Sequence, residues 1–126
     1  MSPQTRQDLM TISIKRIYDP AEEGDGYRVL VDRVWPRGMS KDRAALDDWI
    51  KEVAPSSELR KWFGHDPSRW EEFKKSYFQE LEDKGSVLDQ ISARAEQEPV
   101  TLLYAAKDHE HNNALALKEF LENRMA

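Results

Sequence analysis

The chain of 126 residues contains no cysteine. This absence excludes disulfide bonds, thiolate nucleophiles and Cys-ligated metal centres, and it fits a reducing cellular compartment. A chain of this length buries roughly two thirds of its unfolded surface when it folds, so it needs no covalent cross-link. We therefore expect a single domain with a hydrophobic core of its own.

Long apolar stretches are also missing. No run approaches the roughly 18 residues of a membrane-spanning helix, and residues 1–10 lack the basic start and apolar centre of a signal peptide. We expect a soluble, cytoplasmic protein without a membrane partner. Residues 1–10 are polar and aperiodic, which predicts a loose N-terminal arm, and residues 11–126 are expected to form the single α/β domain.

Basic residues are in the minority, since 19 Lys and Arg face 24 Asp and Glu for a net charge of −5. Residues 28–43 depart from this balance with five basic and two acidic side chains. Such a segment is able to contact nucleic-acid phosphates, but an acidic body repels a polyanion and the chain has no recognition-helix signature. A nucleic-acid-associated regulator is therefore an alternative of lower rank.

Four familiar catalytic signatures do not occur. The sequence has no GxxxxGK phosphate loop, no GxGxxG after a strand, no GxSxG elbow and no HExxH. These absences exclude the corresponding P-loop, dinucleotide-binding, α/β-hydrolase and zinc-protease classes. They leave the reaction, the substrate and any cofactor open.

Three segments carry the pattern of β-strands. Residues 11–18 alternate in polarity, residues 27–35 are rich in β-branched side chains, and residues 100–106 form a continuous apolar run. Such a run is typical of a strand that is covered on both faces, as in a parallel sheet. The acidic stretch 19–26 contains one proline and two glycines and predicts the loop after the first strand.

Apolar residues at helical spacing predict helices between and after these strands. The predicted helices span residues 40–54, 56–63, 67–81, 86–97 and the segment that follows Asp108 or Asn112, either of which can serve as the N-cap. In the first of them, the helical spacing is carried by Leu46, Trp49, Ile50 and Val53. Strands at both ends of the chain with helices between them predict a small layered α/β sandwich, with a mainly parallel sheet and helices packed on it.

Two loops are expected to face one crevice. If the strands at 27–35 and 100–106 are parallel, the loops 32–38 and 107–113 both leave the carboxyl end of the sheet. Open α/β sheets bind their ligands at this edge. The sequence therefore predicts that segments about seventy positions apart contribute to one site.

The first loop concentrates groups that bind anions. Arg33 and Arg37 carry forked donors that suit phosphate or carboxylate, Lys41 adds a charge near a helix start, and the Trp35 indole can stack on a flat ring. Asp32 is a candidate catalytic carboxylate. The structural alternative is that Trp35 packs in the core, Asp32 pairs with an arginine and Arg37 is solvated.

The second loop, KDHEHN, gathers an ammonium, two carboxylates and two imidazoles. Asp108 is a candidate general base or ribose ligand, His109 or His111 is a candidate proton carrier, and Lys107 and Asn112 are candidate ligand-binding groups. His-x-His with a carboxylate can hold a divalent metal, but this spacing matches no specific zinc site, so we assign no metal ligand. The alternative is a helix cap surrounded by solvated side chains.

Aromatic side chains are dense over residues 62–78. Trp62, Phe63 and Trp70 fall within nine residues. They are core residues, or they form an exposed patch if the helices are incompletely covered. An exposed patch would favour a partner-binding module or a homo-oligomer. His65, next to a helix junction, is expected to bridge the two helices.

Three motifs together resemble a known family. YRVLVDRVWPRG, the FGHDPxxWxxFxxxY run at 63–77 and VTLLYAAKDHEHNNALALKEFL, in this order, are similar to the YeaO-like branch of the family called domain of unknown function 488. The resemblance covers residues 11–122. It implies a small bacterial and archaeal α/β domain and supplies no catalytic assignment.

One departure from the family pattern bears on mechanism. More distant members resemble a thiol or metal protein, with a cysteine near the end of the last strand and Cys-His-Arg at the following helix. Here Tyr104 and residues 112–114 stand at roughly those places, so a thiol mechanism is excluded. A site shared with those members must act through Asp32, Arg33, Arg37, Lys107, Asp108, His111 or Asn112.

The leading functional hypothesis is a small-ligand site, enzymatic or not, that is built from the two strand-end loops. Its expected ligand is an anionic or nucleotide-like compound, because arginines, carboxylates and an indole are predicted to converge there.

Overall fold

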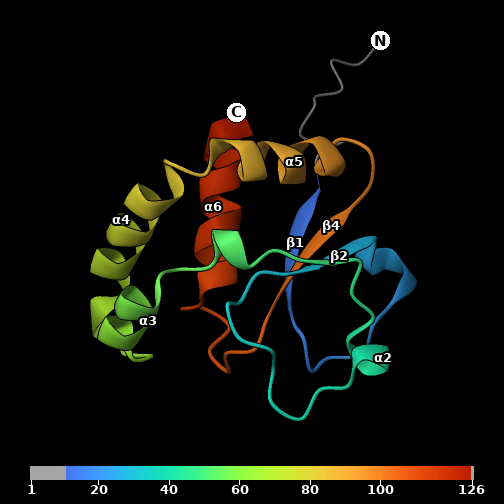
Figure 1. The fold of residues 1–126 in the computed structure, drawn as a ribbon, viewed down its shortest axis with the longest axis horizontal. Helices are drawn as coiled ribbons and strands as arrows, with labels where there is room; N and C mark the ends of the chain where they lie inside the picture. The colour runs from blue at the N-terminus through green and yellow to red at the C-terminus, as the bar shows by residue number, and fades with distance from the viewer. Residues whose placement is uncertain (1–10, 126) are drawn as a thin grey trace.

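The computed structural model describes residues 11–125, so the predicted arm at residues 1–10 lies outside the described residues. Its centre is a four-stranded sheet in the order β1-β4-β2-β3, in which every neighbouring pair is parallel. The strands are β1 (Ile12–Arg16), β2 (Tyr27–Leu30), β3 (Asp48–Trp49) and β4 (Val100–Tyr104). The predicted α/β fold, with a parallel sheet and packed helices, is confirmed (Figure 1).

Helices occupy much of the remaining described chain. They are α2 (Lys41–Ala44), α3 (Ser57–Phe63), α4 (Trp70–Leu81), α5 (Gly85–Ala95) and α6 (Asn113–Met125). Short 3-10 helices form at η1 (Glu23–Asp25), η2 (Lys51–Val53) and η3 (Pro67–Arg69). Over the part of the chain that the structure describes, no helix has the length and apolar character needed to span a bilayer.

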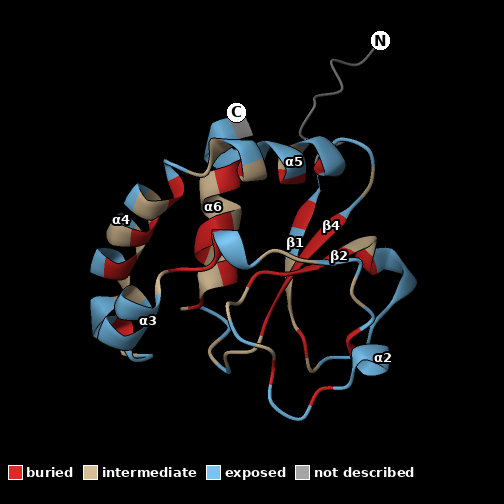
Figure 2. Ribbon diagram, in the orientation of Figure 1, coloured by how far each residue is buried: buried red, intermediate tan, exposed pale blue. Residues whose placement is uncertain are grey.

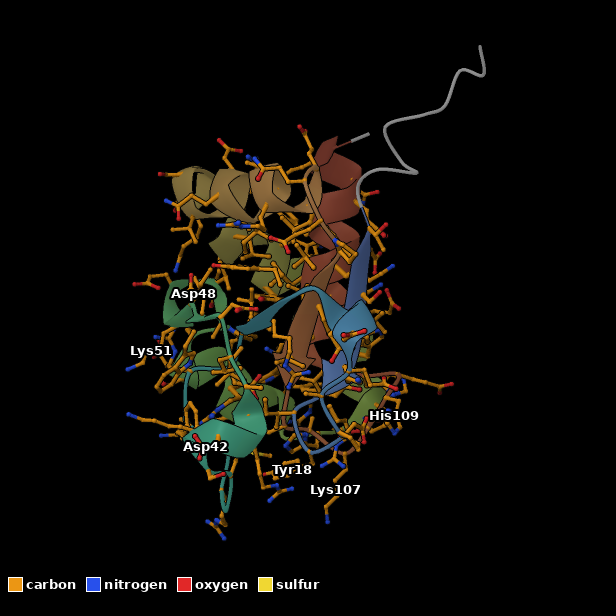
Figure 3. All side chains as sticks on the ribbon, turned by 90° about the vertical axis from the view of Figure 1, so that its right-hand side faces the viewer. Tyr18, Asp42, Asp48, Lys51, Lys107 and His109 are labelled. Atoms are coloured by element: carbon orange, nitrogen blue, oxygen red, sulfur yellow. The ribbon has the colours of Figure 1, made fainter. Side chains whose placement is uncertain are left out.

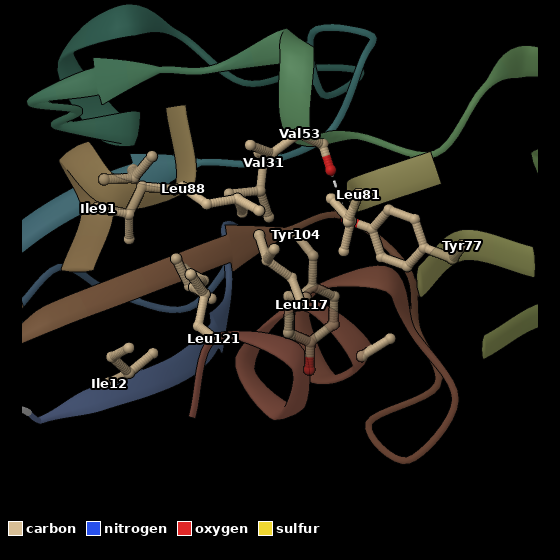
Figure 4. Close-up of a cluster of buried hydrophobic side chains, with 14 of the residues drawn as sticks. Ile12, Val31, Val53, Tyr77, Leu81, Leu88, Ile91, Tyr104, Leu117 and Leu121 are labelled. Carbon is tan, nitrogen blue, oxygen red and sulfur yellow. Dashed lines mark hydrogen bonds between the residues drawn. The ribbon is translucent and has the colours of Figure 1, made fainter. Parts of the chain in front are cut away.

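The larger core lies between the sheet and helices α4, α5 and α6, which gather on one side of the sheet (Figures 1 and 2). Figure 4 shows part of this core, where Tyr77, Leu88 and Leu117 come from the three helices. β4 is buried at all five positions, as its continuous apolar run predicts. Each fully buried leucine or valine in this core stabilises the fold by about 2 kcal/mol.

The opposite face of the sheet is covered by the segment between β2 and β3 instead of by long helices. Leu30 of β2 and Leu103 of β4 pack there against Met39 and Ala44. Trp35 completes this second core, because its indole Nε1 donates to the Met39 carbonyl at 2.8 Å. The sheet is therefore covered by helices on one face and by a folded loop on the other.

The predicted strand over residues 27–35 is too long, since β2 ends at Leu30. The Val31 N–H still donates to the Leu103 carbonyl of β4. The N–H of Ala105, directly after β4, donates to the Asp32 carboxylate instead of to a backbone carbonyl. The Asp32 carboxylate thus takes the place of the next backbone hydrogen bond between the two strands. The chain after Asp32 is then free to leave the sheet and form the covering loop.

The predicted helix over residues 40–54 is wrong beyond its first turn. Ser40 caps α2 as expected, but Ala45 adopts a left-handed conformation (φ 48°) and ends it. The following residues run along the open edge of β2, where the Ile50 N–H donates to the Leu30 carbonyl at 3.0 Å. This pairing gives hydrogen-bond partners to backbone groups on the edge of β2, which would have none if residues 46–50 were helical. The tertiary contact therefore outweighs the local helical spacing.

Other helix boundaries follow the sequence closely. The Ser56 side chain caps α3, Gly64 ends it with φ 52°, and Asp66 caps the turn that leads into α4. Of the two candidate caps for the last helix, Asn112 acts at α6, because its side-chain oxygen accepts from the Leu115 N–H at 2.8 Å. Asp108 instead accepts from N–H groups within its own loop.

Candidate functional site

A cavity of about 440 Å³ lies where β2 and β4 end, within the size range of small-ligand pockets. Both strand-end loops contribute to it, together with α3, its following loop and the start of α6. Its polar lining consists of Asp32, Arg33, Arg60, His65, His111, Asn112 and Asn113. Its apolar lining consists of Ala54, Pro55, Phe63, Phe73, Ala105 and Ala106.

Asp32 is the carboxylate of this cavity, and it is fixed from two sides. One oxygen accepts from the Ala105 N–H at 2.9 Å, and the other accepts from the Asn113 amide at 3.0 Å. Burial raises the pKa of the Asp32 carboxyl above its usual value, although these two donors and the nearby Arg60 charge act in the opposite direction. Each oxygen keeps a lone pair with which to accept from a ligand hydroxyl or amine.

Two arginines supply positive charge. The Arg33 guanidinium is held in place by the Pro55 and Ala54 carbonyls, each at 3.2 Å. Arg60 comes from the exposed side of α3, and within the described residues no hydrogen bond or ion pair engages its guanidinium. The cavity therefore combines one fixed guanidinium with one that is available to a ligand.

His111 is oriented by the second loop. Its Nδ1 lies 2.8 Å from one Asp108 oxygen, and its ring packs edge-on to Trp70 with centroids 5.4 Å apart. The other Asp108 oxygen accepts from the Glu110 and His111 N–H groups at 2.8 and 3.1 Å. These bonds hold the pKa of the Asp108 carboxyl below its usual value, so it is ionised near neutral pH.

His65 is a second imidazole on the cavity wall. It follows Gly64 and has a φ of 58°, a left-handed conformation that residues other than glycine rarely adopt. Its ring lies 6.4 Å from that of Phe63, which in turn stacks on Phe73 at 4.5 Å. The imidazole thus borders an aromatic wall that can receive a flat or apolar part of a ligand.

The structure places the sequence-predicted site residues in two groups. Asp32, Arg33, His111 and Asn112 line the cavity. Trp35, Arg37, Lys41, Lys107 and Asp108 do not line it.

Each residue of the second group has another surrounding. Trp35 packs edge-on to Trp49 with ring centroids 5.4 Å apart, and Arg37 and Lys41 are exposed on the covering loop and α2. Lys107 is exposed at the end of the molecule where Tyr18 also lies (Figure 3). Asp108 contacts two residues that line the cavity: its carboxylate lies against His111, and its backbone carbonyl accepts from the Asn112 amide at 3.0 Å.

The basic stretch 28–43 does not present all its charges to solvent. Arg28 is buried and pairs with Asp25, and Arg33 donates to backbone carbonyls, so Arg37, Lys41 and Arg43 are its exposed cations. The nucleic-acid alternative stays a prediction. No group of three or more His, Asp or Glu side chains within residues 11–125 is arranged to hold a metal ion.

The aromatic segment is largely internal. Phe63, Trp70 and Phe73 contact one another ring to ring, and Trp62 is the exposed member at 42%. The Arg69 guanidinium lies 5.2 Å from the Trp62 ring centre and covers part of it. The partner-binding and oligomeric alternatives stay predictions.

Sequence reasoning did not place Arg60, His65 or Asn113 in the site. Arg60 is one of several charged residues on a short helix, and no local pattern marks which of them faces a strand end. His65 stands out only through its position after Gly64 and is interpreted from sequence as a structural bridge. The one available signal is the run of polar residues 107–113, which ends at Asn113, the first residue of α6.

Replacing Asp32 by alanine should lower the free energy of unfolding by about 1–3 kcal/mol, because the Ala105 N–H loses its acceptor in a half-buried setting. Urea unfolding at pH 7 measures the change. Asp42→Ala is the control, since Asp42 is exposed on α2 and its loss should cost no more than about 0.5 kcal/mol. Equal effects of the two substitutions would contradict a stabilising role for the hydrogen bond between the Ala105 N–H and the Asp32 carboxylate.

Comparison with known proteins identifies relatives along nearly the whole chain. Residues 11–126 match the family model described as "Inactive DUF488-N3 subclade". The chain is 46% identical over 114 residues to the "Uncharacterized protein YeaO" of Escherichia coli (strain K12), covering 90% of this chain and 99% of that protein. It is 38% identical over 115 residues to the "Uncharacterized protein Rv3073c" of Mycobacterium tuberculosis (strain ATCC 25618 / H37Rv), covering 90% and 95%. No solved structure shows significant similarity. These matches agree with the family resemblance of the three sequence motifs, and the chain belongs to the DUF488 family, in the subclade whose model is described as inactive.

Proposed function

We propose that the chain is a binding module for a small anionic compound, which it holds in the cavity at the ends of β2 and β4. The observation that carries this proposal is that two guanidinium groups line a cavity with one carboxylate. That of Arg33 is held by backbone carbonyls, and that of Arg60 has no hydrogen bond or ion pair within residues 11–125. Arginine forks bind carboxylate and phosphate oxygens through charge-assisted hydrogen bonds. The volume and the aromatic wall suit a compound that also carries a ring, such as a nucleotide.

Binding without turnover is the simpler form of this proposal. The matching family model is described as an inactive subclade, and the chain has no cysteine that could act as a nucleophile. Asp32 and His111 then act as ligand-orienting groups, with Asn112 and Asn113 supplying further polar surface. Asp108 supports them by holding the His111 ring.

Arg60→Gln should weaken the binding of adenosine 5′-monophosphate (AMP) by roughly 10- to 100-fold, because it removes a charge-assisted hydrogen bond worth about 1.5–3 kcal/mol. Isothermal titration calorimetry at low salt measures the dissociation constant. Arg43→Gln is the matched control, since Arg43 is exposed on α2 and lies outside the cavity.

A third variant, Arg37→Gln, separates the sequence-predicted site from the cavity. Arg37 does not line the cavity, so its loss should leave the dissociation constant within about twofold of the wild type. The proposal fails if AMP and inorganic phosphate give no binding heat with the wild type. It also fails if Arg43→Gln weakens binding as much as Arg60→Gln.

A further inference from the structure

We propose that the cavity selects phosphomonoesters over phosphodiesters, and that binding one places a proton on His111. This inference rests on the proposed function and names the class of its ligand and the linkage of binding to pH. The observations that carry it are the geometry of the Asp108–His111 pair and the count of donors around the cavity.

The Asp108–His111 contact decides which nitrogen of the ring meets a ligand. Nδ1 lies 2.8 Å from a carboxylate oxygen, and that oxygen can only accept, so Nδ1 carries a hydrogen. Asp108 does not line the cavity, whereas His111 does. The ring nitrogen that remains for the ligand is therefore Nε2, which has a bare lone pair when the imidazole is neutral.

An anionic oxygen is repelled by that lone pair and attracted by an Nε2–H. His111 can meet an anion favourably only after Nε2 has taken up a proton, which comes from solvent, and no covalent bond of the ligand changes. The ionised Asp108 carboxylate then balances the imidazolium from the side away from the cavity. Anion binding and proton uptake are consequently linked.

The charged groups around His111 favour a doubly charged ligand. Arg33 comes from the end of β2, Arg60 from α3 and His65 from the loop after it, while Asp32 is the opposing carboxylate and already accepts two internal hydrogen bonds. Trp70 of α4 contributes a ring edge and no charge. With His111 protonated, the cavity carries an excess of positive charge beyond that needed for a single negative charge.

A phosphomonoester matches this arrangement better than a diester does. Its second ionisation has a pKa of about 6, so it is mostly a dianion above pH 7, and it offers three terminal oxygens. A diester carries one charge and two terminal oxygens. The two guanidinium groups and the imidazolium provide one donor group for each of three oxygens.

The test is isothermal titration calorimetry of AMP and cyclic AMP into the wild-type chain at pH 7.5, repeated in Tris and in Hepes. AMP should bind at least about tenfold more tightly than cyclic AMP. Its observed enthalpy should be more positive in Tris, because proton uptake by the protein draws a proton from a buffer with a larger ionisation enthalpy.

Two variants locate the proton. His111→Gln should lose the buffer dependence, and a thermal unfolding curve checks that it is folded. Asp108→Asn should keep the loop bonds through its amide oxygen and turn its NH₂ towards Nδ1, which moves the ring hydrogen to Nε2. This variant should bind AMP more weakly than the wild type, because its imidazole stays neutral, and it should show no buffer dependence.

The outcomes separate this inference from the proposed function. AMP binding with equal heats in both buffers, equal affinity for cyclic AMP, or a buffer dependence that survives in His111→Gln would overturn the inference while leaving an anion-binding cavity. Absence of any binding by AMP and inorganic phosphate would overturn both.

Discussion

Gly26→Ala should destabilise the protein by about 3 kcal/mol or more, and it should give the largest loss among the substitutions considered for this fold. Gly26 has φ 66° and ψ −128°, a region that is open to glycine and closed to residues with a Cβ. A Cβ built there would lie 2.2 Å from the Pro99 carbonyl oxygen. The strained backbone conformation and the clash with Pro99 therefore both lower the free energy of unfolding of this variant.

The clash cannot be relieved locally, because this turn is docked on the start of β4. The Tyr27 N–H donates to the Pro99 carbonyl at 2.8 Å, and the Thr101 hydroxyl donates to the Asp25 carbonyl at 2.7 Å. Moving the turn away from Pro99 would break these bonds and the start of the β2–β4 pairing. The loss should appear as a lower midpoint in urea unfolding.

Gly24→Ala is the matched control, two residues earlier in the same loop. A Cβ at Gly24 meets nothing within 4 Å, and its φ is not in the left-handed region. This substitution should change stability by no more than about 0.5 kcal/mol. A similar loss in both variants would mean that the loop tolerates no change at all, which contradicts a specific role of the contact between Gly26 and Pro99.

Asp25→Asn should cost about 3 kcal/mol, because it leaves a buried arginine without its counter-ion. The Arg28 side chain is 5% exposed, and its Nη1 lies 2.5 Å from an Asp25 oxygen. Lys15 reaches the other oxygen of the same carboxylate at 3.0 Å. The Ala44 and Ala45 carbonyls bind the remaining Arg28 nitrogens and keep the guanidinium in place.

The control for Asp25 is Glu22→Gln. Glu22 also pairs with Lys15, at 2.8 Å, but its side chain is 72% exposed. An exposed ion pair contributes up to about 1 kcal/mol, so this control should have a much smaller effect on urea unfolding. Losses of equal size in the two variants would contradict the importance of burial for the Asp25–Arg28 pair.

The pH dependence of stability provides a second check on Asp25. Burial alone would raise the pKa of its carboxyl, but the Glu22 N–H, Lys15 and Arg28 together hold that pKa below its usual value. The stabilisation is therefore present above the unfolded-state pKa of about 3.9 and is lost as the pH falls below it. The difference in stability between wild type and Asp25→Asn should narrow as the pH falls from 7 to 3.

Local sequence patterns were sufficient for much of the fold. The continuous apolar run of β4 predicts a strand that is buried on both faces. The predicted helices over 56–63 and 67–81 agree closely with α3 and with the turn and helix α4, and Ser56, Gly64 and Asp66 supply their caps and turn. These signals work because a cap or a left-handed turn is satisfied by atoms within a few residues of it. The parallel direction of the sheet agrees with the long helical connection that precedes β4, whereas the strand order β1-β4-β2-β3 and the short strand β3 were not predicted from the sequence.

Long-range pairing explains the two largest errors in the predicted elements, at residues 27–35 and 40–54. Residues 46–50 have helical spacing, but they are extended because they pair with the open edge of β2. β2 ends early because the Ala105 N–H donates to the Asp32 carboxylate instead of to a backbone carbonyl. Both outcomes depend on partners far away in the sequence. Neither partner can be read from the segment itself.

By itself, the sequence determined the fold class and the family, and it predicts a site at the carboxyl edge of the sheet. It did so because apolar periodicity, caps and parallel connections are local features that constrain where strand ends must meet. Only the tertiary structure decided which side chains face the cavity. It brings Arg60 and His65 to the wall and leaves Trp35, Arg37 and Lys41 outside. The packing of α3 against α4 sets the first arrangement, and the packing of the covering loop on the far face of the sheet sets the second.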